Sequence, residues 1–279
     1  MTPFGTRLRS VTATRGPLCV GIDPHPALLS AWGLEDDLAG LERFAMTVVE
    51  ALGPQVAALK PQSAFFERHG SRGIAVLEQA VAAARSLGAV VILDVKRGDI
   101  GSTMDAYADA YLDPTSPLAV DAVTLSPFLG LESLEPAFER AAAHGGGLFV
   151  LALTSNPQGQ EVQHARGADG RSVAGAVLEG LRRRNGAAFP DQPLGSYGAV
   201  VGATIGGTTE DLAIGGPLLV PGIGAQGGTV DSVGAVFGDA VRDVLPSISR
   251  EVLAAGPARS TLVDAARRAA DAFAALTTP

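Results

Sequence analysis

Eight short apolar runs recur along the chain, and each is followed by a polar or amphipathic stretch. The runs are nearly continuous in Val, Ile, Leu and Ala, as expected for parallel strands that are buried on both faces. This pattern predicts eight strands, at residues 18–23, 56–61, 89–96, 122–127, 148–155, 197–204, 218–224 and 243–250.

Helical periodicity separates these runs. Residues 38–53 place apolar side chains on one stripe and end at a glycine, residues 73–88 do the same, and residues 260–276 close the chain. Residues 156–196 are less regular, with a helix expected around 171–185 between a Gly-rich and a Pro-rich part. Strands alternating with helices predict an α/β fold, a single (β/α)8 TIM barrel, and we expect residues 1–279 to form one domain.

Composition narrows the class of protein. A net charge of −8 argues against a nucleic-acid partner, and the one basic run, at 182–184, is interpreted as a solvated helix face. The single cysteine, Cys19, lies in an apolar run, so we expect a buried thiol in a reducing compartment. Because no apolar stretch approaches the length of a membrane span or signal peptide, we expect a cytoplasmic protein without a membrane partner.

Polar residues gather where the predicted strands end. In a (β/α)8 barrel the chemistry sits at the carboxyl ends of the strands and on the loops that follow them. We therefore expect one rim of the barrel to collect the side chains of Asp23, Lys60, Asp94, Lys96, Ser155, Gln226 and Arg250.

The stretch LDVKRGDIGST, residues 93–103, carries charges of both signs directly after an apolar run. In an extended strand residues i and i+2 point the same way, so Asp94 and Lys96 should share a face that Lys60 can reach from the neighbouring strand. Lys occurs only at positions 60 and 96, and the other 19 of the 21 basic residues (21 − 2) are Arg. A Lys ammonium can donate a proton and recover it whereas a guanidinium does not, which favours proton transfer over a purely structural ion-pair layer.

Two other uses of these charges stay open. Asp23, Asp94 and Asp99 could bind Mg²⁺, although the two Lys would compete for the same carboxylates. A Schiff-base Lys would need a lowered pKa, and flanking Asp residues raise it. The four His, at 25, 69, 144 and 164, show no spacing of metal ligands, and His25 is interpreted as a loop residue.

The Gly-rich sequence GIGAQG, residues 222–227, matches G-x-G-x-x-G. That fingerprint normally opens a dinucleotide-binding unit, but six predicted strands precede it here. In a barrel the loops after strands seven and eight commonly hold a phosphate, to which Arg250 could add a charge-assisted contact. We favour a phosphate site over a dinucleotide site or a plain turn.

These motifs resemble those of the orotidine 5'-phosphate decarboxylase family, and most of all its longer bacterial subgroup. DVKRGDIGST carries D-x-K-x-x-D-I-x-x-T, and further matches are GIDP at 21–24, LKP at 59–61, LTSNP at 153–157, PGIGAQGG at 221–228 and Arg250. Sugar-phosphate decarboxylases of the same superfamily share D-x-K-x-x-D alone, and the combination with DIGST and PGIGAQGG favours the first family.

The resemblance implies decarboxylation of orotidine 5'-monophosphate to UMP in pyrimidine biosynthesis, with no metal, no organic cofactor and a homodimer. It implies that Lys96 protonates the ring carbon, in an array with Lys60, Asp94 and Asp99. It implies further that Asp99, Ile100 and Thr103 cross the dimer interface, and that the remaining substrate contacts come from Asp23, Ser155, Gln226 and Arg250.

Three rival functions remain at this stage. The first is an Mg²⁺-dependent decarboxylase of a keto-sugar phosphate from the same superfamily. The second is a nicotinamide oxidoreductase that uses Gly222 to Gly227. The third is a non-catalytic protein that binds a phosphate ligand.

Overall fold

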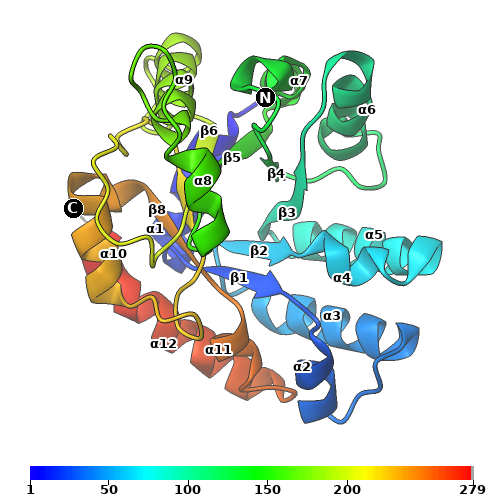
Figure 1. The fold of residues 1–279 in the computed structure, drawn as a ribbon. Coiled ribbons are helices and arrows are strands. Elements are labelled where there is room, and N and C mark those ends of the chain that lie inside the picture. Colours follow the sequence, from blue (N-terminus) through cyan, green and yellow to red (C-terminus); the bar gives the residue numbers. More distant parts are fainter. Residues whose placement is uncertain (278–279) are drawn as a thin grey trace.

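The computed structural model describes residues 1–277 and contains a closed barrel of eight parallel strands (Figure 1). The strands pair in sequence order, and β1 pairs with β8 to close the ring. This confirms the predicted (β/α)8 barrel. The strands are β1 Cys19–Ile22, β2 Ala58–Pro61, β3 Val90–Arg97, β4 Ala122–Leu125, β5 Gly147–Leu153, β6 Tyr197–Val201, β7 Leu218–Val220 and β8 Val244–Ile248.

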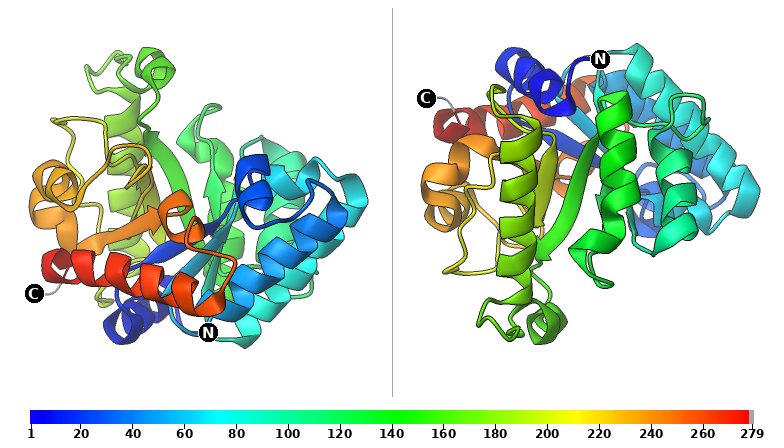
Figure 2. Two further views of the ribbon diagram at one scale, coloured as in Figure 1. Left: turned by 90° about the horizontal axis from the view of Figure 1, so that it is seen from below. Right: turned by 90° about the horizontal axis from the view of Figure 1, so that it is seen from above.

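Helices surround the strands, and the long C-terminal helix packs beside α3 (Figures 1 and 2). The α-helices are α1 Phe4–Arg15, α2 Pro26–Ala31, α3 Leu38–Leu52, α4 Ser63–Glu67, α5 Gly70–Ser86, α6 Gly101–Leu112, α7 Glu135–His144, α8 Gln160–Gln163, α9 Val173–Ala188, α10 Val230–Phe237, α11 Arg250–Leu253 and α12 Arg259–Thr277. Three 3₁₀ turns, η1 to η3, span Leu131–Leu134, Pro157–Gly159 and Gly238–Asp243. None of the helices within residues 1–277 combines the length and apolar character that crossing a bilayer requires.

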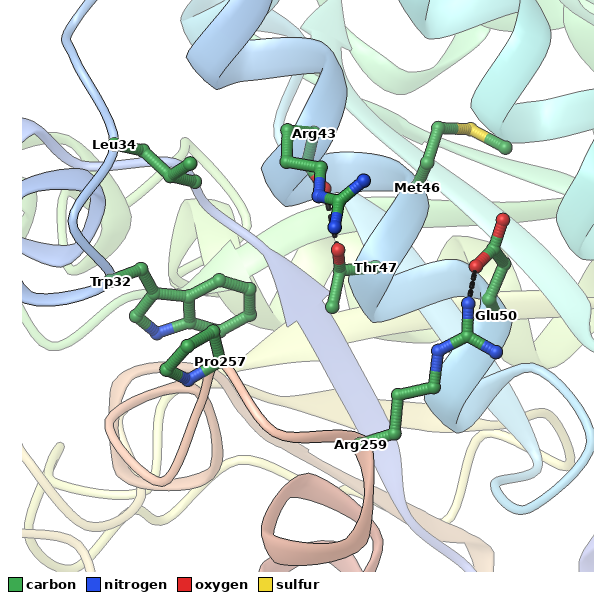
Figure 3. Close-up of a pocket in the computed structure, with 8 residues that line it drawn as sticks. All are labelled: Trp32, Leu34, Arg43, Met46, Thr47, Glu50, Pro257 and Arg259. Atoms are coloured by element: carbon green, nitrogen blue, oxygen red, sulfur yellow. Dashed lines mark hydrogen bonds and ion pairs between the residues drawn. The ribbon is translucent and has the colours of Figure 1, made fainter.

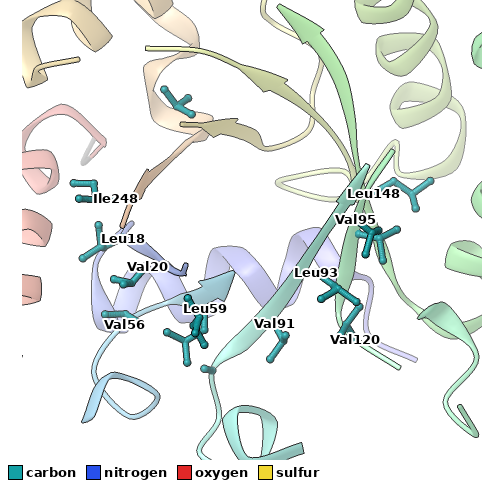
Figure 4. Packing of buried hydrophobic residues seen from close by; sticks show 14 of the residues in the cluster. Leu18, Val20, Val56, Leu59, Val91, Leu93, Val95, Val120, Leu148 and Ile248 are labelled. Atoms are coloured by element: carbon teal, nitrogen blue, oxygen red, sulfur yellow. The ribbon is translucent and has the colours of Figure 1, made fainter. Parts of the chain in front are cut away.

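Alternation along each strand divides the buried residues into two clusters. The outer cluster lies between strands and helices and includes Val20, Leu59, Val91 and Leu93, several of which Figure 4 shows. The inner cluster fills the barrel and takes the residues in between, including Cys19, Ala58, Val90, Ile92, Ala122 and Leu245. Because successive side chains point to opposite faces of a strand, continuing the inner series places Lys60, Asp94, Thr124 and Ser247 inside the barrel, towards its carboxyl end.

The amino end of the barrel is closed by α1, which the sequence analysis did not predict. Phe4 and Leu8 belong to the inner cluster and are buried, and the Phe4 ring meets Phe149 edge-on with 5.9 Å between centroids. The remaining positions of this helix are largely polar, so its sequence carries no strong amphipathic stripe. Phe4, Leu8 and the partly buried Val11 follow the spacing i, i+4, i+7, and this short apolar stripe is the signal in the sequence.

Several strands end earlier than the apolar runs suggested. β5 ends at Leu153 and β8 at Ile248, so Ser155 lies in a loop and Arg250 begins α11 instead of ending the last strand. The helix expected around 171–185 is α9, whose first turn is capped by Ser172, because its hydroxyl accepts a hydrogen bond from Gly175 N. These shifts move side chains along the rim and leave the topology as predicted.

Candidate active site

A cavity of ≈ 480 Å³ opens at the carboxyl ends of the strands. It collects seven of the predicted site residues, namely Asp23, Lys60, Asp94, Lys96, Ser155, Gln226 and Arg250. Asp99, Ile100 and Thr103, also predicted, are not among the residues that line it. The rim thus brings together side chains separated by more than two hundred positions in the sequence, as the predicted (β/α)8 barrel requires.

The floor of this cavity holds a three-residue ion cluster. Lys60 Nζ lies 2.8 Å from Asp94 Oδ2, and Lys96 Nζ lies 2.5 Å from Asp94 Oδ1. The side chains of Lys60 and Asp94 are 7% and 9% exposed, whereas that of Lys96 is 45% exposed and faces the cavity. The only two lysines of the chain therefore meet at one carboxylate.

Neighbouring charges favour the ionised forms of Asp94 and Lys60. Burial raises the pKa of Asp94, but the nearby ammonium groups of Lys60 and Lys96 outweigh it and lower the pKa below its usual range. Burial lowers the pKa of Lys60, and the carboxylates of Asp94 and Asp23 outweigh that effect and raise it. A Schiff-base role for Lys60 would need the opposite shift, so this alternative does not fit the site.

Lys96 does not continue the regular strand that the i, i+2 argument assumed. Its φ is 48°, the only positive φ at a non-glycine residue among those described. Leu93 pairs with Val123 and Arg97 pairs with Leu125, so the register slips between these pairs. Lys96 and Asp94 do meet, as predicted, but a β-bulge brings them together, not a regular pleat.

Asp23 lies one residue beyond β1 on the cavity wall. Its Oδ1 is buried and has no hydrogen-bond partner within the described residues. A buried carboxylate oxygen without a donor is costly, so a donor from a bound molecule would relieve that cost. Asp23 is therefore suited to accept a hydrogen bond from a ligand hydroxyl.

The Gly-rich loop follows β7 and precedes α10, as predicted. Gly222, Gly224 and Gly227 all have positive φ, which side chains rarely tolerate. Ala225 and Gln226 at the tip of this loop line the cavity, and Arg250 lies across from them at the start of α11. The strands form a closed barrel in sequence order and not the doubly wound sheet of dinucleotide-binding folds. The fold therefore favours the interpretation of this loop as a phosphate site.

The structure adds residues to the cavity that sequence reasoning missed. They include Gln62, Thr124, Ser247 and Ser249, as well as His25, which was interpreted only as a loop residue. Thr124 and Ser247 lie two positions after the inner residues Ala122 and Leu245, so strand periodicity was a signal for both. The His25 ring packs edge-on against the ring of Phe65, with 4.4 Å between centroids.

The three carboxylates considered for Mg²⁺ do not form a site together. Both oxygens of Asp94 contact ammonium groups, and Asp99 Oδ1 accepts a hydrogen bond from the Ile100 N–H outside the cavity. Within residues 1–277 no group of three His, Cys, Asp or Glu side chains is placed to hold a metal ion. Cys19 is buried, as expected, and burial raises its pKa to about 12, so it is no nucleophile.

A second cavity of ≈ 350 Å³ lies away from the barrel mouth, between α3 and the start of α12 (Figure 3). Trp32 and Pro257 form one side, and the ion pair of Arg259 with Glu50 borders the other. Its Arg and Glu side chains are exposed, and none of the buried unpaired atoms found in residues 1–277 belongs to its lining. The charged cavity at the barrel rim is therefore the candidate active site.

Comparison with known proteins agrees with this geometry. Residues 16–264 match the model of the orotidine 5'-phosphate decarboxylase / HUMPS family. An orotidine 5'-phosphate decarboxylase from a Nocardioides strain is 66% identical over 256 residues, covering 91% of this chain and 92% of the relative. The one from Salinispora tropica is 62% identical over 279 residues, covering 99% of both chains.

A solved structure agrees as well. A candidate orotidine 5'-phosphate decarboxylase from Streptomyces avermitilis superposes with a TM-score of 0.97 at 59% identity, covering 100% of this chain and 97% of the other. The family model, the identity over nearly the full length and the fold therefore lead to one assignment. The chain belongs to the orotidine 5'-phosphate decarboxylase / HUMPS family.

Proposed function

We propose that Lys60, Asp94 and Lys96 carry out the reaction of this family, the decarboxylation of orotidine 5'-monophosphate to UMP and CO₂, without a metal or an organic cofactor. One observation carries the proposal: Asp94 accepts from both lysines of the chain on the floor of the rim cavity. The lowered pKa of Asp94 and the raised pKa of Lys60 support an array that stays charged at neutral pH.

The chemistry asks for a fixed positive charge and one proton. When the bond from C6 to the carboxylate breaks, CO₂ leaves and the electron pair stays on C6. The Lys96 ammonium next to that carbon stabilises the pair and transfers a proton to it, which gives UMP and a neutral amine that water reprotonates. Asp94 orients both lysines, and its own negative charge disfavours the bound substrate carboxylate until CO₂ departs.

The rest of the cavity is suited to the nucleotide. Asp23, with its unpartnered oxygen, and Lys60 would bind ribose hydroxyls. Ser155 would contact the pyrimidine, and Gln226 would reach from the base towards the phosphate. Arg250, beside the Gly-rich loop, would bind the phosphate with a charge-assisted contact. The phosphate lies far from C6, so its binding energy can be used to close the loop over the substrate.

A homodimer would complete the site. Asp99, Ile100 and Thr103 lie outside the cavity of their own chain, at the start of α6. Ile100 is 62% exposed, and Phe128 and Leu129 on the next loop are 76% and 52% exposed. Large apolar side chains that are exposed on neighbouring loops are consistent with a protein interface. In the proposed dimer Asp99 joins the charged array of the other subunit, Ile100 lines its pocket, and Thr103 contacts the ribose there.

The test is turnover of orotidine 5'-monophosphate, followed by ultraviolet absorbance with excess EDTA present. We expect rapid turnover that EDTA does not change and that Lys96→Ala abolishes. Absence of turnover by folded protein contradicts the proposal, and turnover that EDTA stops contradicts its metal-free part.

Mixing two inactive variants tests the shared site. If Asp99 serves the other subunit, Lys96→Ala and Asp99→Ala chains together regain activity, because each mixed dimer contains one intact site. Mixtures that stay as inactive as the separate variants, although exchange of subunits is demonstrated, contradict the proposed interface.

A further inference from the structure

The seam between β3 and β4 is irregular at the active site. Leu93 pairs with Val123 and Arg97 pairs with Leu125. Three residues of β3, positions 94 to 96, therefore face the single residue Thr124 on β4. A bulge leaves backbone groups without ladder partners, and bulges beside active sites commonly redirect a side chain. Here the redirected side chain is that of Lys96.

The hydroxyl of Thr124 bonds to all three bulged residues. It donates to Asp94 Oδ1 at 2.9 Å and accepts from the backbone N–H groups of Val95 and Lys96, both at 3.0 Å. A hydroxyl has one proton to donate and two lone pairs, so this set uses its full capacity. Thr124 is 1% exposed, so water does not substitute for it in the folded protein.

These bonds stabilise an unfavourable backbone. Lys96 has a φ of 48°, in the left-handed region that a non-glycine residue occupies only where its surroundings impose it. The Thr124 hydroxyl binds the N–H of Lys96 and also the carboxylate oxygen that the Lys96 ammonium contacts, at 2.5 Å. One oxygen of Thr124 thus contacts the backbone of Lys96 directly and its ammonium through Asp94.

Another contact holds the bulge from the opposite side. Arg97 Nη1 donates to the Val95 carbonyl at 3.2 Å, and Arg97 Nη2 pairs with Glu67 at 2.6 Å. These groups belong to a partly exposed network and touch neither the Lys96 N–H nor Asp94. Gln62 Nε2 also donates to the backbone carbonyl of Asp94, at 3.4 Å. Among the hydrogen bonds found in residues 1–277, those of the Thr124 hydroxyl are the ones that join the bulged N–H groups to the Asp94 carboxylate.

We propose that Thr124 is a positioning residue for decarboxylation, whose hydroxyl holds the Lys96 ammonium at the reacting carbon. The inference rests on the proposed function and extends it to a residue of the cavity floor for which the proposed function names no substrate contact. Without the hydroxyl the buried N–H of Val95 and the partly buried N–H of Lys96 lose their acceptor, and Lys96 relaxes towards an extended backbone. Its ammonium then moves away from Asp94 and from C6.

The test compares Thr124→Val, which keeps the shape and removes the hydroxyl, with Thr124→Ser, which keeps the hydroxyl. Displacement of a reacting group by about 1 Å can cost about 10²-fold in rate, and we expect that fall in kcat for Thr124→Val. KM for orotidine 5'-monophosphate and the calorimetric Kd of UMP should change little, because the residues proposed to bind phosphate and base lie on the loops after β5 and β7 and at the start of α11. Thr124→Ser should retain the wild-type kcat.

Ser196→Ala is the matched control. Ser196 is 1% exposed, and its hydroxyl accepts from the Gly5 N–H, so the substitution also removes a buried acceptor, at the amino end of the barrel. We expect it to lower stability and to leave kcat unchanged. If Thr124→Val fails to fold, Thr124→Cys replaces it, because a thiol is only a weak donor and acceptor. That variant should show an intermediate kcat.

Three results would overturn the inference: a wild-type kcat in Thr124→Val, an equal loss in Thr124→Ser, or a loss confined to UMP affinity. A crystal structure of Thr124→Val decides independently of turnover, since Lys96 unchanged in φ and in contact with Asp94 would also overturn it. If wild-type protein itself does not decarboxylate the nucleotide, the proposed function fails, and this crystal structure still tests the positioning role.

Discussion

Each end of the barrel contains a buried carboxylate, and the two carboxylates pair with different cations. At the carboxyl end Asp94 accepts from Lys60, Lys96 and the Thr124 hydroxyl. At the amino end Asp121 accepts from Arg7 at 2.5 Å and from the backbone N–H of Val91 at 2.9 Å. Both carboxylates bridge β3 to neighbouring elements, so their structural tasks are similar.

The cations differ between the ends. Arg7 anchors α1 to the barrel, a task that a permanent charge with several donors performs well. The other ion pairs found in residues 1–277 also use Arg, and lysines appear only at Asp94. The chain departs from its preference for Arg only at the cavity where the proposed reaction requires a proton to be given and recovered. The amino end is therefore a natural control for the carboxyl end.

The largest effect should come from exchanging the two kinds of cation. Lys96→Arg keeps the charge and removes the transferable proton, so we expect kcat to fall by about 10²–10⁴-fold. Arg7→Lys should leave kcat unchanged and lower stability slightly. The absorbance assay with EDTA measures kcat for both variants. Wild-type turnover by Lys96→Arg would contradict the chemical distinction between the two ends of the barrel.

Neutralising each carboxylate should separate the ends in stability. Asp94→Asn leaves the buried Lys60 ammonium without its partner, a loss of about 3–5 kcal/mol in the free energy of unfolding, together with activity. The Arg7 side chain is 37% exposed and can turn to water, so Asp121→Asn should cost only about 1 kcal/mol. Urea denaturation of both variants measures these losses in the free energy of unfolding. Equal losses would show that burial of the cation does not determine the loss.

Helix α1, with its buried Phe4, allows a large structural change far from the active site. Phe4 is fully buried against Phe149, and Phe4→Ala should lower the free energy of unfolding by about 3 kcal/mol. This is the low end for such changes, because α1 lies at the end of the barrel and can shift to fill part of the space. We expect kcat per folded molecule to be unchanged. A parallel fall in kcat would mean that the ends are coupled.

The smallest effect is the dependence of stability on pH. The pKa of Asp94 is lowered in the folded state, so its contribution is complete above the unfolded value of ~4 and is lost as the pH falls towards the folded value. The pKa of Lys60 is raised, so its contribution is complete below ~10.4 and is lost as the pH rises through the folded value.

Urea titrations of wild type and Asp94→Asn across these pH values measure this contribution. The advantage of wild type over Asp94→Asn should be constant near neutrality and shrink by roughly 2 kcal/mol in strong acid. An advantage that persists unchanged in acid would contradict a lowered pKa for Asp94.

Much of the fold follows from local patterns. The eight apolar runs predicted the eight strands in order, because parallel strands buried on both faces leave an uninterrupted apolar signature. Helix α1 was not predicted, because the apolar contacts of Phe4 and Leu8 form only with the interior of the closed barrel. The assignment of residues 1–279 to one domain stays a prediction.

For the site, the chain by itself determined which residues converge: strand ends share a rim, and the two lysines stand out in a chain that otherwise uses Arg. Only the tertiary structure decided how they meet. The bulge at Lys96 arises from the register between β3 and β4, and Thr124 matters because it lies opposite that bulge. Register and bulges depend on contacts between strands distant in the chain, and local periodicity does not encode them.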